Sequence, residues 1–199
     1  MKTFEQYIRE AIDFRLGGSQ KKGSREEYQY FPKDREELGK CMKEIFDKDG
    51  DDGNYNLIDV SEIIDFSSFF MHSGRFKTCN LSDWDVSNVT NMECMFCHSE
   101  FNGDISGWDV SNVKNMKEMF SYSDFDGDIS NWNVSKVTNM NKMFLRSKFS
   151  QDLSAWKPVK LKKADKTFGN TPISASKKYP QWYIDLKDEE WVKRNIGRH

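Results

Sequence analysis

The stretch DISGWDVSNVKNMKEMF at residues 104–120 returns at residues 128–144 as DISNWNVSKVTNMNKMF. The same unit recurs along the chain, because tryptophans stand at one constant interval at Trp84, Trp108, Trp132 and Trp156. A period of about 20 to 50 residues is the signature of stacked repeats, in which no single unit can bury its own apolar edge. The sequence therefore predicts a repeat domain.

Two apolar spacings alternate inside each unit. Residues 105–113 follow the pattern IxxWxVxxV, which is typical of the short strand of a leucine-rich repeat. Residues 116–120 follow MxxMF, which has the i, i+3, i+4 spacing of one helix face. We therefore predict an α/β repeat solenoid, leucine-rich repeat-like, over residues 57–173 with about four to five coils. Short parallel strands would form one face of this solenoid, and short helices would form the other.

The two quoted stretches resemble the BspA-like leucine-rich repeat family, which also occurs in mycoplasma lipoproteins. The resemblance covers about residues 57–173. It implies the leucine-rich repeat fold and a role in contacts between proteins, because members of that family are often surface proteins linked to adhesion. It implies no catalytic residues.

The segments outside the repeats are expected to extend the solenoid or to cover its ends. We predict an N-terminal helix and flexible linker over residues 1–24 and a helical N-terminal cap over residues 25–56, with its helix at about Lys33–Phe46. A C-terminal cap is predicted over residues 174–199, with a helix at about Asp185–Asn195. The opening MKTFEQYIREA also resembles, weakly, the head-targeting leaders of internal proteins in tailed bacteriophages, and cleavage would follow Glu10. A plain amphipathic helix is the alternative.

Composition and charge exclude several classes of protein. The 30 Lys and Arg balance 32 Asp and Glu, whereas a nucleic-acid binder would carry a basic excess, so we expect no nucleic-acid partner. No uncharged apolar run approaches the roughly 18 residues that cross a bilayer, so we expect no membrane span. The N-terminus has no apolar signal core, and the four cysteines are not spaced as a disulfide framework. We expect a cytoplasmic protein at synthesis, with packaging in a phage virion as the alternative.

Motifs that carry chemistry are scarce. The sequence has no GxxxxGK[ST], GxGxxG, GxSxG or HExxH motif, so we expect no enzyme, no catalytic residue and no cofactor. A zinc site could combine Cys79, Cys94, Cys97 and either His72 or His98, but one cysteine pair alone has ligand-like spacing, and free thiols are the preferred interpretation. The DKDGDDG stretch at 47–53 resembles the start of a calcium loop but lacks the closing ligand, which favours a solvated acidic turn. We predict no metal.

The predicted binding surface consists of the side chains between the framework residues of each strand, because leucine-rich repeat proteins usually bind through them. These partner-binding residues are Asp83, Asp85, Asn88, Asp109, Asn112, Asn131, Asn133, Lys136, Lys157 and Lys160. With Asp counted as −1 and Lys as +1, their net charge changes from coil to coil through −2, −1, +1 and +2. Such a gradient can orient a protein partner, although a solvated face would also show one by chance. We expect a non-enzymatic module that binds an unidentified protein, or alternatively an internal structural protein of a phage virion.

Overall fold

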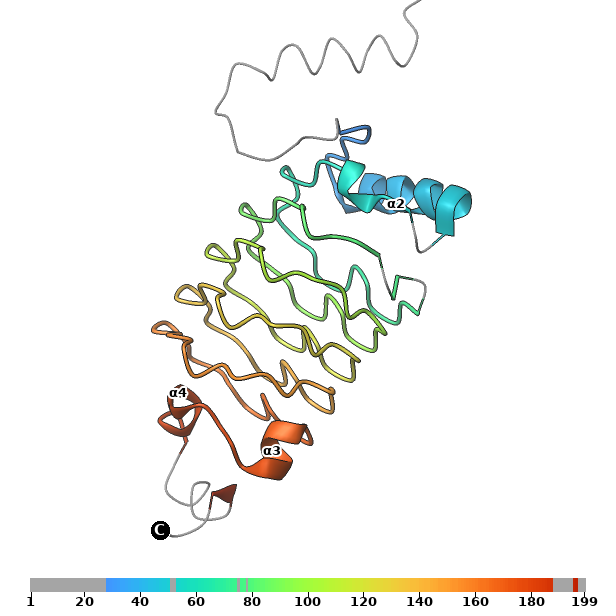
Figure 1. Ribbon diagram of the computed structural model, residues 1–199. Helices are drawn as coiled ribbons and strands as arrows, with labels where there is room; N and C mark the ends of the chain where they lie inside the picture. Colours follow the sequence, from blue (N-terminus) through green and yellow to red (C-terminus); the bar gives the residue numbers. More distant parts are fainter. Residues whose placement is uncertain (1–27, 51–52, 75, 78, 188–194, 197–199) are drawn as a thin grey trace, which may run out of the picture.

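The computed structural model describes residues 28–50, 53–74, 76–77, 79–187 and 195–196. In this part of the chain, repeated coils lie side by side in an elongated stack (Figure 1). Helix α2 (Arg35–Asp49) covers one end, and the short helices α3 (Pro172–Ser176) and α4 (Gln181–Ile184) lie at the other. The 3-10 turn η2 (Tyr55–Leu57) leads into the first coil. The predicted N-terminal helix, linker and Glu10 site lie outside the described residues, as does most of the predicted C-terminal helix.

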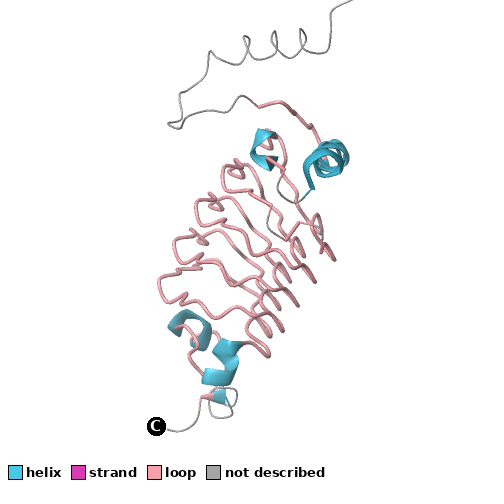
Figure 2. Ribbon diagram, turned by 45° about the vertical axis from the view of Figure 1, so that its right-hand side comes forward, coloured by secondary structure: helices cyan, strands magenta, loops and turns pink. Residues whose placement is uncertain are grey.

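The prediction of an α/β solenoid with parallel strands is wrong. No strand is present among the described residues, and the coils consist of loops and turns (Figure 2). The β-type pairing between neighbouring coils is limited to isolated parallel bridges, which join residues 65 to 91, 91 to 115, 115 to 139 and 139 to 163. The predicted helical face is also absent, because the described residues between η2 and α3 contain no helix. Each coil therefore consists of a series of turns in place of a strand and a helix.

The segment predicted as a strand folds into two tight turns. The N–H of Trp108 donates to the carbonyl of Ile105 at 3.2 Å, and the Asp104 carboxylate accepts from the N–H of Ser106 at 2.9 Å. The same arrangement follows at Asp109, in the turn at residues 110–113. Aspartate side chains favour such turns because they mimic a backbone acceptor. These bonds occupy the N–H groups within the coil, so they cannot form a ladder with the next coil.

The segment predicted as a helical turn is a row of turns in which left-handed residues recur. Glu118 and Tyr122 both have φ 55°, which interrupts an α-helix. The side chain of Asn115, expected to cap a helix, accepts instead from the N–H of Lys117 at 3.1 Å. The N–H groups of alternate residues from 116 to 122 donate to carbonyls of the next coil at 2.7 to 2.9 Å. Backbone bonding between coils thus replaces bonding within a helix.

The apolar rows of the repeat fill the interior. The four tryptophans are at most 4% exposed, and the Met and Phe residues of the repeated units are fully buried or nearly so. Each indole N–H donates to a carbonyl of the preceding coil, as Trp108 does to Leu81 at 2.9 Å. The rings of Phe70, Phe96 and the equivalent residues 120, 144 and 168 stack with centroids 5.1 to 5.7 Å apart. The core is therefore one continuous column along the stack.

Both ends of this column are covered. Helix α2 buries Leu38, Met42 and Ile45, and it begins and ends later than the predicted Lys33–Phe46 because Asp34 caps its start and Gly50 caps its end. At the other end, the indole of Trp182 donates to the carbonyl of Leu153 at 2.9 Å, as each repeat tryptophan does to its own preceding coil. Trp182 therefore extends the tryptophan row by one member beyond the last repeat.

Asp65, which forms the bridge to Asn91, supports a prediction about stability in acid. Partial burial of Asp65 would raise its pKa, but hydrogen bonds from Ser67 and Asn91 and the charge of Arg35 outweigh that effect and lower the pKa. A carboxylate with a lowered folded-state pKa stabilises the fold above its unfolded pKa of about 4, and this contribution is lost as pH falls through the folded pKa. We expect Asp65→Asn to flatten the fall in unfolding free energy between about pH 5 and pH 2. Urea denaturation across that range measures it, and an unchanged slope would contradict this role.

Candidate functional site

The ten predicted partner-binding residues lie in rows along the stack, and we call them the outer turn face. They lie on the paired turns of each coil, which take the place of the predicted strands. One row holds Asp83 and Asn131, a second holds Asp85, Asp109, Asn133 and Lys157, and a third holds Asn88, Asn112, Lys136 and Lys160. Eight of the ten are exposed, whereas Asp85 and Asn112 are partly buried.

The second row has a structural role that sequence reasoning did not assign to it. The side-chain oxygens of Asp85, Asp109 and Asn133 accept from the N–H of the serine two residues later, at 3.1, 3.0 and 3.2 Å. Asp104, Asp128 and Asp152 make the same local contact. These contacts lower the pKa of Asp104 and of Asp128, chiefly through the backbone hydrogen bonds from Ser106 and Ser130. Substitutions at Asp85, Asp109 and Asn133 must therefore keep a side-chain acceptor if the turn is to be retained.

The third row ties neighbouring coils together. The amide of Asn88 donates to the carbonyl of Ser61 at 2.9 Å, and that of Asn112 donates to the carbonyl of Ser87 at 2.8 Å. The ammonium of Lys136 donates to Asn112 Oδ1 at 2.6 Å. At the ends of the second and third rows, Lys157 and Lys160 are exposed, and neither forms an ion pair with another described residue. These two positive charges lie at the opposite end of the face from Asp83 and Asp85.

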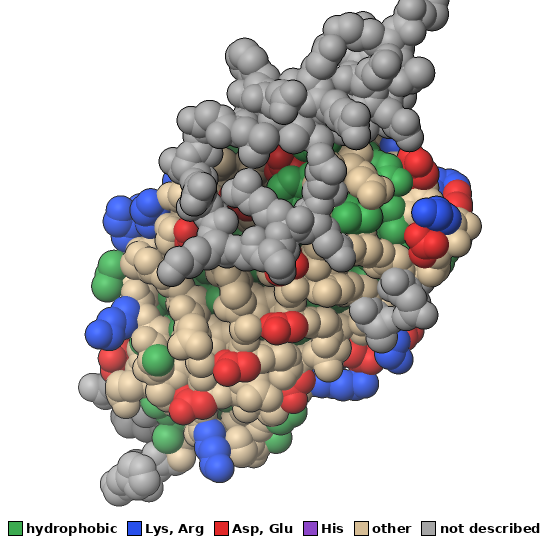
Figure 3. Space-filling view, turned by 45° about the horizontal axis from the view of Figure 1, so that its top comes forward, with side chains coloured by type: hydrophobic (Ala, Val, Ile, Leu, Met, Phe, Trp, Pro, Cys, Tyr) green, Lys and Arg blue, Asp and Glu red, His purple; other side chains and the backbone are tan. Residues whose placement is uncertain are grey.

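The surface of the stack is polar and regular. Acidic side chains recur at similar intervals across the face seen in Figure 3, between polar and backbone atoms. A hollow of about 340 Å³ lies where the start of α2 meets residues 62–65, and it is lined by charged groups with Ile63 and Ile64. No residue that lines it is a histidine, cysteine or serine.

The buried polar side chains serve the backbone. Among the described residues they are serines and threonines, and each hydroxyl donates to a main-chain carbonyl, as Ser123 does to Phe120 at 2.8 Å and Thr167 to Met140 at 2.9 Å. Buried polar groups need such partners, so these hydroxyls are accounted for by the fold.

Sequence reasoning missed an exposed row of rings. The imidazoles of His72 and His98 stack at 4.8 Å, His98 stacks on Tyr122 at 4.5 Å, and the guanidinium of Arg146 lies 5.4 Å from the Tyr122 centroid. All four residues occupy the same place in successive coils, at left-handed backbone positions. Their recurrence once in every unit is the signal that could have grouped them.

Three side chains of types that can bind a metal lie together, although the sequence analysis preferred free thiols and predicted no metal. Cys94 and Cys97 belong to the zinc set that the sequence allowed, and the structure adds Glu118, with one ligand atom of each residue within 4.8 Å of the others. Burial, with neighbouring Cys94 and Glu118, raises the pKa of the Cys97 thiol to about 12, and burial also raises that of Cys94. Cys79 does not belong to this group, and its thiol contacts the carbonyl of Phe76 at 3.3 Å.

The calcium interpretation of residues 47–53 is not fully covered by the structure. Residues 51 and 52 lie outside the described part of the chain. Asp47 lies in helix α2, where it pairs with Lys43. The acidic side chain at this position is therefore part of an ion pair on the helix surface.

These features define a repeat protein made of stacked coils, each built from turns, in which the bridged residues lie 26 residues apart at the first step and 24 apart at the later ones. The family model described as "Mycoplasma protein of unknown function, DUF285" matches residues 40–124 and 121–184. The chain belongs to this family. The match supports the resemblance to mycoplasma-type repeats at this coarse level, and it does not extend to the leader at residues 1–11. No curated protein and no solved structure matches the chain. No helix in the described residues is long and apolar enough to cross a membrane.

Proposed function

We propose that the chain is a non-enzymatic module that binds another protein through the outer turn face. The observation that carries this proposal is the change of charge along the face, from Asp83 and Asp85 at one end to Lys157 and Lys160 at the other. Complementary charge on a partner would set its direction along the stack and speed its association. The matching partner surface is basic where it meets the first coil and acidic where it meets the last.

A second reason why the face favours binding is that its side chains are already ordered by hydrogen bonds within and between the coils. Side chains such as Asp85 and Asn112 already hold fixed positions through their contacts with Ser87. A group that is ordered before binding loses less conformational entropy on binding. Repeat proteins commonly bind through extended surfaces of this kind, in which each coil contributes equivalent positions.

The non-enzymatic part of the proposal rests on the described polar groups. The buried hydroxyls donate to main-chain carbonyls, and the hollow beside α2 is lined by no serine, cysteine or histidine. The alternative of an internal virion protein rests on residues 1–11, which lie outside the described residues, and it stays a prediction.

The test of the proposal removes charge without removing the turn acceptor. Asn can replace Asp85 and still accept from Ser87, so the variant Asp83→Asn, Asp85→Asn, Lys157→Gln, Lys160→Gln should keep the fold. We expect its association rate with a partner to fall on the order of tenfold at low salt, while the dissociation rate changes less. The partner is first recovered by cross-linking from cell lysate, and its kinetics are then measured by surface plasmon resonance at several salt concentrations.

The matched control neutralises two exposed lysines outside the face, in the variant Lys177→Gln, Lys178→Gln. This control uses the same Lys→Gln substitution but leaves the ten residues intact. It lowers the net charge by 2, whereas the losses in the fourfold variant cancel, so it should associate nearly as the parent does if the face, and not the net charge, steers association. An association rate that ignored both the fourfold substitution and added salt would refute binding through this face.

A further inference from the structure

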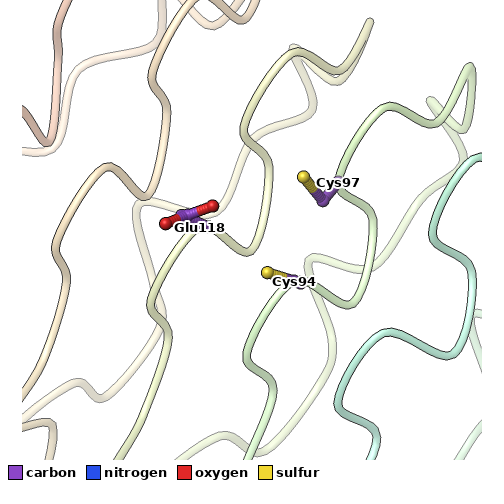
Figure 4. A group of neighbouring side chains, drawn as sticks. All are labelled: Cys94, Cys97 and Glu118. Atoms are coloured by element: carbon purple, nitrogen blue, oxygen red, sulfur yellow. The ribbon is translucent and has the colours of Figure 1, made fainter.

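The side chains of Cys94, Cys97 and Glu118 meet between two neighbouring coils. Figure 4 shows the two cysteines on successive turns of one coil, with the Glu118 carboxylate facing them from the next. One ligand atom of each residue lies within 4.8 Å of the other two. We propose that these three residues bind one divalent cation of the zinc class.

The repeat brings the three ligands together. Cys94 and Glu118 occupy the same position in successive units, and both have φ 55°. The N–H of Cys94 donates to the carbonyl of Lys117 at 2.9 Å, which fixes the two coils in register beside the ligands. Cys97 follows at the next turn, where its N–H donates to the carbonyl of Cys94 at 3.1 Å. The backbone therefore holds the ligand positions before any ion arrives.

The cluster occurs once in the described stack. The residues equivalent to Cys94 in other coils are Ser68, Glu118, Lys142 and Lys166, and those equivalent to Cys97 are Met71, Ser121, Leu145 and Gly169. The coils that contain Glu118 and Lys142 nevertheless bury the same Met, Met and Phe set as the coil that contains Cys94. Packing of the repeat therefore does not require the two thiols and the carboxylate to lie together.

The donor set suits a zinc-class ion. Thiolate sulfur and carboxylate oxygen are ordinary zinc ligands, with bonds of about 2.3 Å and about 2.0–2.2 Å. Two sulfurs on a tetrahedral ion with such bonds stand about 3.8 Å apart, so side-chain adjustments of about 1 Å would close the site. Binding exchanges each of two S–H bonds for an S–metal bond, and both protons pass to the solvent. No electron is transferred, so no oxidant or reductant is needed.

The charges around the site are compatible with occupancy. Two thiolates, one carboxylate and a divalent ion leave one negative charge. Lys117 and Lys142 stand beside the cluster, with their Nζ atoms 3.9 and 3.4 Å from Glu118 Oε1. Lys117 lies closer to Glu93 Oε1, at 2.8 Å, so Lys142 is the lysine that mainly offsets the remaining charge.

The site has a closed side and an open side. The side chain of Cys97 is buried, whereas Cys94 and Glu118 are partly exposed. Three protein ligands leave one tetrahedral position for water or another small ligand. Because the partly exposed ligands border the solvent, that position would be reached from outside the stack.

Cobalt titration tests this inference on the full chain. The metal-free protein, kept reduced, is titrated with Co²⁺ and then with Zn²⁺, and native mass spectrometry counts the bound ions. We expect one ion per chain, with thiolate-to-cobalt charge-transfer absorption that Zn²⁺ abolishes. Cys97→Ser and Cys94→Ser should each remove most of this absorption, and Glu118→Gln should weaken affinity at least tenfold while leaving sulfur coordination detectable.

The matched control is Cys41→Ser, which removes a partly buried thiol in helix α2 that is not part of the cluster. It should bind one ion with the affinity of the parent. Far-ultraviolet circular dichroism of each metal-free variant shows whether the fold is retained, and Cys97→Ala provides a second test if Cys97→Ser unfolds. Absence of charge-transfer absorption in the parent, or its survival in folded Cys94 and Cys97 variants, would overturn the site.

Discussion

Replacing Trp108 by alanine is expected to lower the free energy of unfolding by about 3–5 kcal/mol. Its ring is 3% exposed and stacks on Trp84 at 6.5 Å and on Phe96 at 6.3 Å, so the substitution removes a large part of the column between two coils. It also leaves the carbonyl of Leu81 without the indole donor. For a chain of this length the melting temperature should fall by roughly 6–20 °C, measured by circular dichroism.

Two further variants separate the causes of that loss. Trp108→Phe keeps an aromatic ring but removes the indole N–H, so it should lose less than the alanine variant. Gly107→Ala changes the adjacent exposed residue, where an added Cβ meets nothing within 4 Å, and should change stability by less than about 0.5 kcal/mol. If Trp108→Ala melted within a degree or two of the parent, the tryptophan row would not be a main support of the stack.

The interior of the repeat could be predicted from the sequence because burial follows the apolar spacing directly. The residues of the IxxWxVxxV and MxxMF patterns do point inward, including Trp108, Val113 and Met119. Their backbone could not be predicted from the same spacing. An apolar spacing specifies which side chains share a face, but the coils satisfy it with turns, since Asp104 and Asp109 bond the N–H groups of Ser106 and Ser111.

A better prediction of the turns was available in the polar residues. Asp-x-Ser recurs twice in the unit at 104–120, and aspartate followed by serine is a turn signal in its own right. The left-handed positions were harder to foresee. Glu118 and Lys142 are not residue types that favour φ 55°, and their conformation follows from hydrogen bonds to the next coil, which lies a whole repeat away in the sequence.

The candidate sites also have a part that could be predicted from the sequence and a part that could not. The outer turn face could be assembled from sequence because its members repeat at fixed intervals, although their bonds to Ser87, Ser111 and Ser135 could not. The ligand cluster depends on register between coils. Cys94 and Cys97 are close in sequence, but Glu118 joins them only because a residue faces its equivalent in the next coil.

Replacing Tyr183 by alanine should open the C-terminal end of the stack. Its side chain is 2% exposed, and its ring meets Phe168 edge-on, with centroids 5.0 Å apart. We expect a loss of about 3–5 kcal/mol, measured by urea denaturation. The uncovered end of a repeat array exposes apolar surface, so sedimentation should also detect self-association. Full stability in a monomeric Tyr183→Ala protein would show that the end of the column needs no cover.

Tyr183→Phe isolates the phenol from the ring. The hydroxyl bonds to the backbone of Thr167, so its removal should lower stability by about 0.5–1.5 kcal/mol without self-association. Burial raises the pKa of Tyr183 well above its ordinary value near 10. A group with a raised folded-state pKa contributes its full stability below the unfolded pKa and loses it as pH rises through the folded value. The parent should therefore lose stability above about pH 10 more steeply than Tyr183→Phe, and equal alkaline profiles would place the ionising group elsewhere.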